Sequence, residues 1–168
     1  APEVIASALA AATAPFGRQE RFQVDGREAR VLLAKNPAGL NEVLRTLAVT
    51  DGPLTVLAML NDGIQDGQDV SWIYDADIEL LAGRELQLVC SGDRADDFAL
   101  RWVLAGIEPR SVVLDTEAAL DAALAATSEG ARLDVVATYT AMLDVREALA
   151  RRAGTASYWE TPGEERAR

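Results

Sequence analysis

The chain has 168 residues, of which 49% are hydrophobic and 26% charged, a composition typical of one compact globular domain. Its 27 acidic residues outnumber the 16 basic ones, and the net charge of −11 has the wrong sign for a protein that neutralises nucleic-acid phosphates or binds an acidic membrane surface. No apolar run is long enough to predict a transmembrane helix, and no basic region precedes the Ala-rich start, so we expect neither a membrane span nor a signal peptide.

The sequence contains no histidine and a single cysteine, Cys90. The chain by itself therefore cannot form a Ser-His-Asp or Cys-His catalytic centre, a Cys/His zinc site or an intramolecular disulfide. The cysteine usage fits a reducing cytoplasm. Cys90 ends an apolar run, and we interpret it as a buried small hydrophobe rather than a nucleophile.

Strands and helices alternate along the chain. Asp25-Gly26 predicts the tight turn of a hairpin between strands over 21–24 and 27–33. Asn36 and Pro37 suit the cap and the first position of a helix with apolar residues at i, i+3, i+4 and i+7. We expect further strands over 53–60, 71–74, 85–90, 110–114 and 133–138, and further helical segments over 75–81, 95–105, 116–126 and 140–152. The side chains of the 95–105 helix that we expect to face the core are Phe98, Ala99, Trp102 and Val103.

This alternation predicts an α/β fold with a mostly parallel sheet and helices on both faces. We place the α/β domain at residues 16–153, after an N-terminal helix or remnant of a preceding domain (1–15) and before a polar tail (154–168). Ligands of such folds bind beyond the carboxyl ends of the strands, so the loops at that edge are the candidate sites.

The first candidate loop follows the strand that ends at Ala34. Lys35 is the only lysine of the chain, and a helix that begins beside it favours an anion such as phosphate or carboxylate. Alternatively, Asn36 is only a helix cap and Lys35 a solvated charge. The sequence lacks both G-x-G-x-x-G and G-x-x-x-x-G-K-[ST], so the chain is not a complete P-loop ATPase.

The second candidate loop, 61–77, carries five aspartates with Trp72 and Tyr74 beside them. Their spacing does not match a calcium-binding loop, and we expect no metal site here. Crowded carboxylates repel one another, so the loop is either solvated or faces the cations of a partner. Tyr139-Thr140, after the last strand, lies at the same edge and either begins a helix or binds a ligand.

These loops resemble one family. LLAKNPAGLNEVL (32–44) and LNDGIQDGQDVSWIYDADIE (60–79) resemble the C-terminal, Rossmann-like domain of MurT, the Mur-ligase-like subunit of bacterial lipid II isoglutaminyl synthase. SGDRADDFALR (91–101) and ATYTAML (137–143) lie where that family has related segments. The resemblance covers residues 16–150. Its second motif is specific, whereas the first is shared by Mur ligases in general.

The resemblance implies an ATP-dependent glutamine amidotransferase that amidates the α-carboxyl of D-glutamate in the stem peptide of lipid II. Its partner, the glutaminase GatD, supplies the ammonia from glutamine. ATP and Mg are implied for the full-length subunit, whose ATP-binding loop belongs to a domain absent from this chain. We therefore expect no cofactor in this domain and no activity of the domain alone. The implied location is the cytoplasm, at the inner face of the membrane.

The resemblance also implies roles for individual residues. GatD-type glutaminases carry a catalytic Cys and His, and the D-x-S-W-I-[WY]-D motif of MurT donates the third member of the triad, an aspartate that falls on Asp69, with Asp66 as its competitor. Gly63-Ile64-Gln65 departs from the asparagine- and alanine-containing stretch of the family. The residues expected to line the substrate and nucleotide cleft are Lys35, Asn36, Asn61, Asp62, Tyr139 and Thr140, and those expected to contact the partner are Trp72, Tyr74 and Asp75.

Two alternative functions stay open at this point. In a purely structural docking domain the aspartates would make surface contacts only. A receiver-like signalling domain would use its strand-end acids to bind magnesium and accept a phosphoryl group. Such a site needs a lysine at the end of a late strand, where this chain has Thr138-Tyr139-Thr140.

Overall fold

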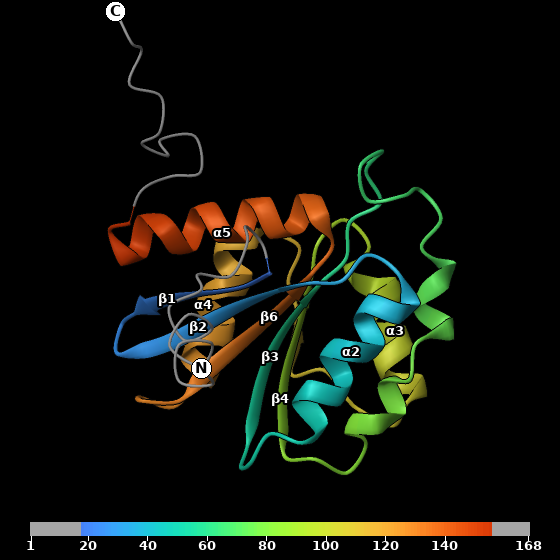
Figure 1. The fold of residues 1–168 in the computed structure, drawn as a ribbon, viewed down its shortest axis with the longest axis horizontal. Coiled ribbons are helices and arrows are strands. Elements are labelled where there is room, and N and C mark those ends of the chain that lie inside the picture. The colour runs from blue at the N-terminus through green and yellow to red at the C-terminus, as the bar shows by residue number, and fades with distance from the viewer. Residues whose placement is uncertain (1–17, 156–168) are drawn as a thin grey trace, which may run out of the picture.

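The computed structural model describes residues 18–155 (Figure 1). The strands are β1 (Arg18–Val24), β2 (Arg27–Leu33), β3 (Leu54–Met59), β4 (Leu86–Ser91), β5 (Ser111–Val112) and β6 (Arg132–Ala137). The α-helices are α2 (Pro37–Ala48), α3 (Ala95–Leu104), α4 (Thr116–Ala126) and α5 (Tyr139–Ala153), and the 3₁₀ helices are η1 (Ser71–Asp75) and η2 (Ile78–Leu81). The expected helix over 1–15 and the tail from residue 156 onward lie outside the described residues.

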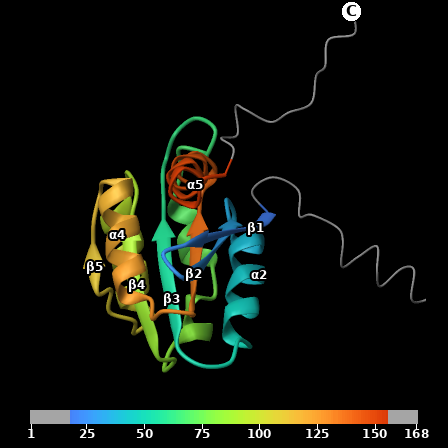
Figure 2. The ribbon, with the colours of Figure 1, turned by 90° about the vertical axis from the view of Figure 1, so that its left-hand side faces the viewer.

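The strands form one sheet in the order β1-β2-β6-β3-β4-β5. Strand β1 pairs with β2 antiparallel, and all other pairs are parallel. One apolar cluster joins α2, α3, η1 and η2 to one face of the sheet, and a second joins α4 and α5 to the other. Figure 2 shows α2 and α4 on opposite sides of the strands. The predicted α/β architecture, mostly parallel with helices on both faces, is confirmed. Within the described part of the chain, no helix has the length and apolar character needed to cross a bilayer.

Local signals in the sequence account for the first elements. Asp25 and Gly26 both have positive φ angles, 50° and 71°, as the tight turn of the predicted hairpin requires. The Asn36 side chain accepts a hydrogen bond from the Gly39 N–H at 2.8 Å, and Pro37 occupies the first position of α2. The hairpin and the capped helix are therefore confirmed.

The strand predicted over 71–74 is wrong, because the segment forms the 3₁₀ helix η1. The buried residues Ile73 and Ala76 are three positions apart, which is the repeat of a 3₁₀ helix. A strand that buried Ile73 would turn Ser71 and Asp75 toward the core with it, because side chains alternate along a strand.

Two smaller predictions also differ from the structure. Val103 is 38% exposed, and its place on the inward face of α3 is taken by Arg101, which binds carbonyl groups described below. Strand β5 is limited to Ser111–Val112 instead of 110–114, because it pairs with β4 alone at the edge of the sheet.

The N-terminus of α5 is capped by a side chain from a distant loop. Its own cap residue, Thr138, makes no side-chain capping hydrogen bond. Instead, the buried Asp66 carboxylate accepts the Thr140 N–H at 2.8 Å and the Thr140 hydroxyl at 2.5 Å. A carboxylate at this end of a helix satisfies a free N–H and complements the helix dipole. Asp66 therefore holds the loop after β3 against α5.

Asp66→Ala should lower the free energy of unfolding by about 1–2 kcal/mol, the usual cost of removing a helix cap. Urea unfolding followed by circular dichroism measures it. Asp62→Ala, which removes a half-exposed ion pair with Arg94 in the same loop, should change the free energy by less than about 0.5 kcal/mol. Equal losses in the two variants would contradict the capping role.

Cys90 lies in β4 with its side chain fully buried, as predicted. Burial raises the pKa of its thiol to about 12, because the apolar surroundings disfavour the thiolate.

The Cys90 thiol should consequently react with a thiol reagent only when the chain opens. At pH 8 we expect labelling of the native chain to be at least about 100-fold slower than labelling in denaturant. Labelling of the native chain at the denatured rate would show that the β4 core is open.

Candidate functional site at the carboxyl edge of the sheet

Asn61 joins the carboxyl ends of three strands. Its backbone N–H, just after β3, donates to the Thr138 hydroxyl oxygen at 2.9 Å, beyond the end of β6. Its side-chain amide donates to the Thr140 hydroxyl oxygen at 2.9 Å and accepts the N–H of Asp93, after β4, at 3.0 Å. Since Asn61 is 8% exposed, these bonds are largely shielded from water, and they fix the loops at this edge relative to one another.

The loop after β4 approaches Asn61 closely enough to require glycine. Gly92 has a φ of +96°, and a Cβ there would lie 2.5 Å from the Leu60 carbonyl oxygen and 2.7 Å from Asn61 Oδ1. Gly92 therefore permits the contact between the β3 and β4 ends.

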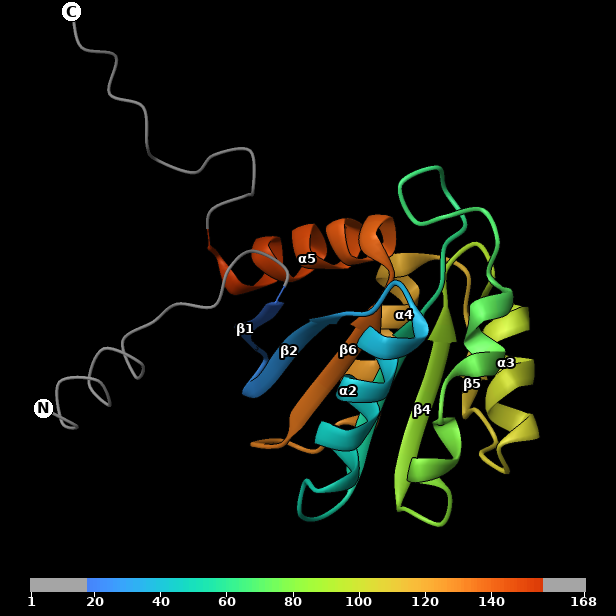
Figure 3. The same cartoon turned by 45° about the vertical axis from the view of Figure 1, so that its right-hand side comes forward.

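The two competing aspartates of the 61–70 loop have different environments. Asp66 is 6% exposed and engaged with Thr140 inside the protein, whereas Asp69 is exposed. Figure 3 shows this loop in green beyond the ends of β4 and β6, beside the first turn of α5. Asp69 is thus the one of the two whose carboxylate is open to a group from outside the chain.

Ser71 fixes the orientation and the charge of Asp69. Its N–H donates to Asp69 Oδ1 at 2.8 Å. Hydrogen bonds from the hydroxyl and the N–H of Ser71 hold the pKa of Asp69 below its usual range. At neutral pH, Asp69 is an ionised acceptor at the surface with oxygen lone pairs left to bind a donor.

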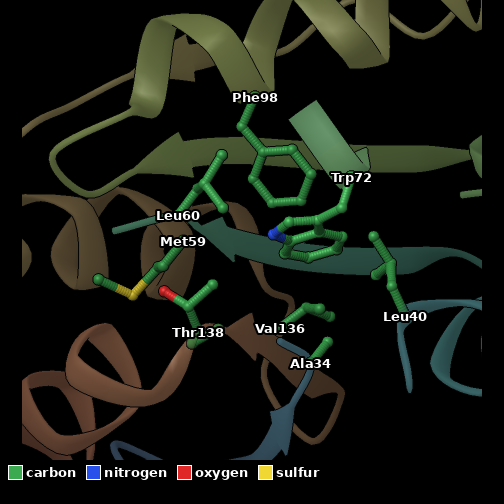
Figure 4. Close-up of a pocket in the computed structure, with 9 residues that line it drawn as sticks. Ala34, Leu40, Met59, Leu60, Trp72, Phe98, Val136 and Thr138 are labelled. Atoms are coloured by element: carbon green, nitrogen blue, oxygen red, sulfur yellow. The ribbon is translucent and has the colours of Figure 1, made fainter. Parts of the chain in front are cut away.

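The residues predicted to contact a partner divide into one anchor and two exposed side chains. Trp72 is partly buried and packs beside Leu40, Leu60 and Phe98 in the small space shown in Figure 4, which has no room for a water molecule. Tyr74 is 50% exposed, and Asp75 is also exposed. Trp72 therefore fixes η1 to the core, while Tyr74 and Asp75 are accessible.

The cleft residues predicted from the sequence are not equally available. Lys35 is exposed and, with Asn36, Gln19 and Glu42, lines a surface hollow of about 260 Å³. Asn36 is engaged as the cap of α2, as one of the two alternatives predicted.

At the ends of β3 and β6, the predicted cleft residues mostly serve the fold. Asn61 and Thr140 bind each other, and Tyr139 packs against the apolar cluster under α4 and α5. Asp62 pairs with Arg94 at 3.2 Å. Asp97 and then Asp62 raise the pKa of Arg94.

Sequence reasoning missed two features of this edge. Arg101 is buried on α3. It lies three residues after the buried Phe98, and this helical spacing is the sequence signal that places it on the inward face. Asp144 on α5 lies near two other carboxylates, and partial burial together with the charges of Asp93 and Asp66 raises its pKa. Among the residues that the structure describes, no group of three or more His, Cys, Asp or Glu side chains is arranged to hold a metal ion.

Solved structures with the same fold are Mur ligases and folylpolyglutamate synthases. The chain matches E. coli FolC in complex with DHPP and ADP with a TM-score of 0.58 and 20% identity, over 90% of this chain and 35% of that one. It matches the MurF ligase from Thermotoga maritima in complex with ADP with a TM-score of 0.54 and 15% identity, over 87% of this chain and 33% of that one. At these identities the similarity shows the fold alone.

Sequence comparison gives a more specific result. The family described as MurT ligase C-terminal matches residues 33–142. The lipid II isoglutaminyl synthase (glutamine-hydrolyzing) subunit MurT of Staphylococcus aureus (strain COL) is 39% identical over 60% of this chain, and the subunit of the same name from Streptococcus pneumoniae (strain ATCC BAA-255 / R6) is 31% identical over 83%. The chain spans 23% and 31% of the length of these relatives. It belongs to the MurT ligase C-terminal family.

Proposed function

We propose that this chain is the C-terminal domain of a MurT subunit of glutamine-hydrolysing lipid II isoglutaminyl synthase, an ATP-dependent ligase complex that amidates the α-carboxyl of D-glutamate in lipid II. The family match and the names of the two relatives support this proposal. Because the chain spans less than a third of either relative, the reaction would belong to a longer protein acting at the cytoplasmic face of the membrane, where its lipid substrate is found. The same family match leaves the receiver-like alternative without support.

The contribution of this domain would be to dock a GatD-type glutaminase and complete its catalytic triad through Asp69. A carboxylate that accepts the N–H of an imidazole fixes its tautomer and stabilises the imidazolium formed when the cysteine is activated. The observation that carries this role is the exposed, ionised and oriented carboxylate of Asp69 in a chain without histidine. Asp66 is a poorer candidate, because its oxygens bind Thr140 inside the protein.

The side chains around Asp69 suit a protein partner. Ile64 is 85% exposed in the same loop, and Tyr74 presents half of its surface in the neighbouring η1. Tyrosine is favoured in interfaces because it combines apolar area with a hydrogen-bonding hydroxyl. The glutaminase would thus contact Ile64, Tyr74 and Asp75 around the carboxylate that it uses.

The residues of this chain do not fit a nucleoside triphosphate by themselves. Lys35 is the cation beside the hollow near α2, and neither phosphate-binding glycine motif occurs in the sequence. On the α5 side of the edge, Asp66, Asp93 and Asp144 lie close enough to shift a pKa and would repel phosphate. ATP and Mg would therefore be bound mainly by other parts of the full-length subunit, with Lys35 at most approaching them.

Asp69→Asn in the full-length subunit should lower the kcat of glutamine hydrolysis by the complex about 10²–10⁴-fold, because the imidazole is no longer held in its active tautomer. The dissociation constant of the two subunits should change less than about threefold. Steady-state glutaminase kinetics at saturating subunit and a binding titration measure the two quantities separately.

Asp77→Asn is the matched control, an exposed aspartate eight residues further along the same segment, and should leave both quantities unchanged. Unaltered hydrolysis in the Asp69 variant would contradict the triad role. Weaker association with unchanged kcat would identify a purely structural docking domain instead.

The isolated domain should bind ATP weakly or not at all, with a dissociation constant above about 1 mM. Isothermal titration calorimetry with ATP and Mg measures it, and the full-length subunit is the positive control. Micromolar binding by this chain alone would contradict the division of roles proposed here.

A further inference from the structure

Arg101 is a cation buried in the last turn of α3, with 6% of its side chain exposed. Its Nε donates to the Ile73 carbonyl oxygen at 3.1 Å, and its Nη2 donates to the Ala76 carbonyl oxygen at 2.6 Å. Nη2 also bonds to Glu79 Oε2 at 2.9 Å. A buried guanidinium is stable only where its N–H groups find acceptors, and all three of these acceptors lie within one stretch of seven residues.

That stretch has little regular hydrogen-bonded structure of its own and is held to the rest of the domain by tertiary contacts, among them the buried side chains of Ile73 and Ile78. It consists of the 3₁₀ helices η1 and η2, of five and four residues, and neither has a side-chain cap. Helices this short have little stability of their own and depend on tertiary contacts. One guanidinium bonded to η1, to the residue after it and to η2 fixes both helices against α3.

Asp69 is connected to the same stretch. Its carboxylate is oriented by the N–H of Ser71, the first residue of η1, and the Ile73 carbonyl bound by Arg101 lies two residues further on. The Ile73 side chain is fully buried, so η1 is held both by its apolar side chain and by this carbonyl. Movement of η1 away from α3 would therefore displace Ser71 and, with it, the Asp69 carboxylate.

The interaction is specific for arginine. The planar fork of the guanidinium can reach separate acceptors at fixed angles, whereas a lysine ammonium at this depth is a point charge on a flexible stem. The backbone carbonyls contribute more to the anchor than Glu79, because that side chain is 59% exposed and its ion pair is screened by solvent.

We infer that Arg101 is a positioning residue for Asp69, which holds the η1–η2 segment so that the carboxylate meets the catalytic histidine of the glutaminase. This inference rests on the proposed function of Asp69. Arg101 touches neither the glutamine nor the histidine and acts only through the backbone of η1.

Arg84 provides a matched control with the same chemistry at the other end of the sheet. Its guanidinium binds the carbonyl oxygens of Ala48, Thr50 and Gly52, in the turn that leads into β3. Arg84→Met and Arg101→Met each remove one guanidinium from three oxygen acceptors. Only the second should affect the segment beside Asp69.

The test uses the full-length subunit in complex with its glutaminase, below the melting temperature of every variant. Arg101→Met should lower the kcat of glutamine hydrolysis about 10–100-fold, the cost of displacing a catalytic group by roughly 1 Å, with the KM for glutamine unchanged. Arg101→Lys, which keeps the charge but not the planar fork, should lower kcat by about threefold. Arg84→Met should lower the melting temperature but leave kcat within about twofold.

Two further measurements separate positioning from general stability. Hydrogen exchange should become faster in residues 70–79 of the Arg101→Met variant and in residues 48–54 of the Arg84→Met variant. Arg101→Met should also lower kcat little further when Asp69→Asn is already present, because both changes act on the same carboxylate.

The outcomes separate the positioning role of Arg101 from the proposed triad role of Asp69. If Asp69→Asn abolishes hydrolysis while Arg101→Met leaves it within twofold, or if Arg84→Met is equally harmful, the positioning role is wrong and the proposed function stands. If Asp69→Asn leaves hydrolysis intact, the proposed function is wrong, and the kinetic role of Arg101 is overturned with it. Unchanged exchange over 70–79 in the Arg101→Met variant would overturn the anchor itself.

Discussion

The hydrogen bonds between Asp66 and Thr140 are the constraint on which the rest of this edge depends. They attach the loop after β3 to the first turn of α5, and Asn61 extends the same network to the end of β4. At its other end, the segment is attached to α3 through Arg101. The stretch between these attachments is short and carries Asp69 at the surface. A charged side chain can be held in one orientation there because buried neighbours, rather than the charge itself, hold the backbone.

The parts of the fold that the sequence predicts are those with local causes. Asp25-Gly26 forms a tight turn by its own φ angles, and Asn36 caps the helix that begins at the next residue by accepting the Gly39 N–H. The sequence of the 71–74 segment does not distinguish a strand from the 3₁₀ helix η1, because a short apolar run suits a strand and a buried helical turn equally. Hydropathy counts a guanidinium as polar and therefore predicts an exposed Arg101, although its N–H groups donate to the buried carbonyl groups of Ile73 and Ala76.

For the candidate site, the sequence predicts the edge of the sheet at which it lies but not which aspartate is accessible. The alternation of strands and helices predicts which edge carries it, because the carboxyl ends of parallel strands meet there. The choice between Asp66 and Asp69 cannot be made locally, since both aspartates follow polar residues in one loop. What separates their environments is Thr140, which lies 74 positions from Asp66 in the sequence. The resemblance to MurT indicated Asp69, and the buried contacts of Asp66 give that preference a physical reason.

The central claim is that a carboxylate of this domain orients a histidine of another protein. The most direct measurement is a crystal structure of the full-length subunit bound to its glutaminase. We predict that an oxygen of Asp69 lies within hydrogen-bond distance of the N–H of the catalytic imidazole, with η1 still held by α3. An Asp69 left in solvent, or an imidazole oriented by a carboxylate of the glutaminase itself, would contradict it.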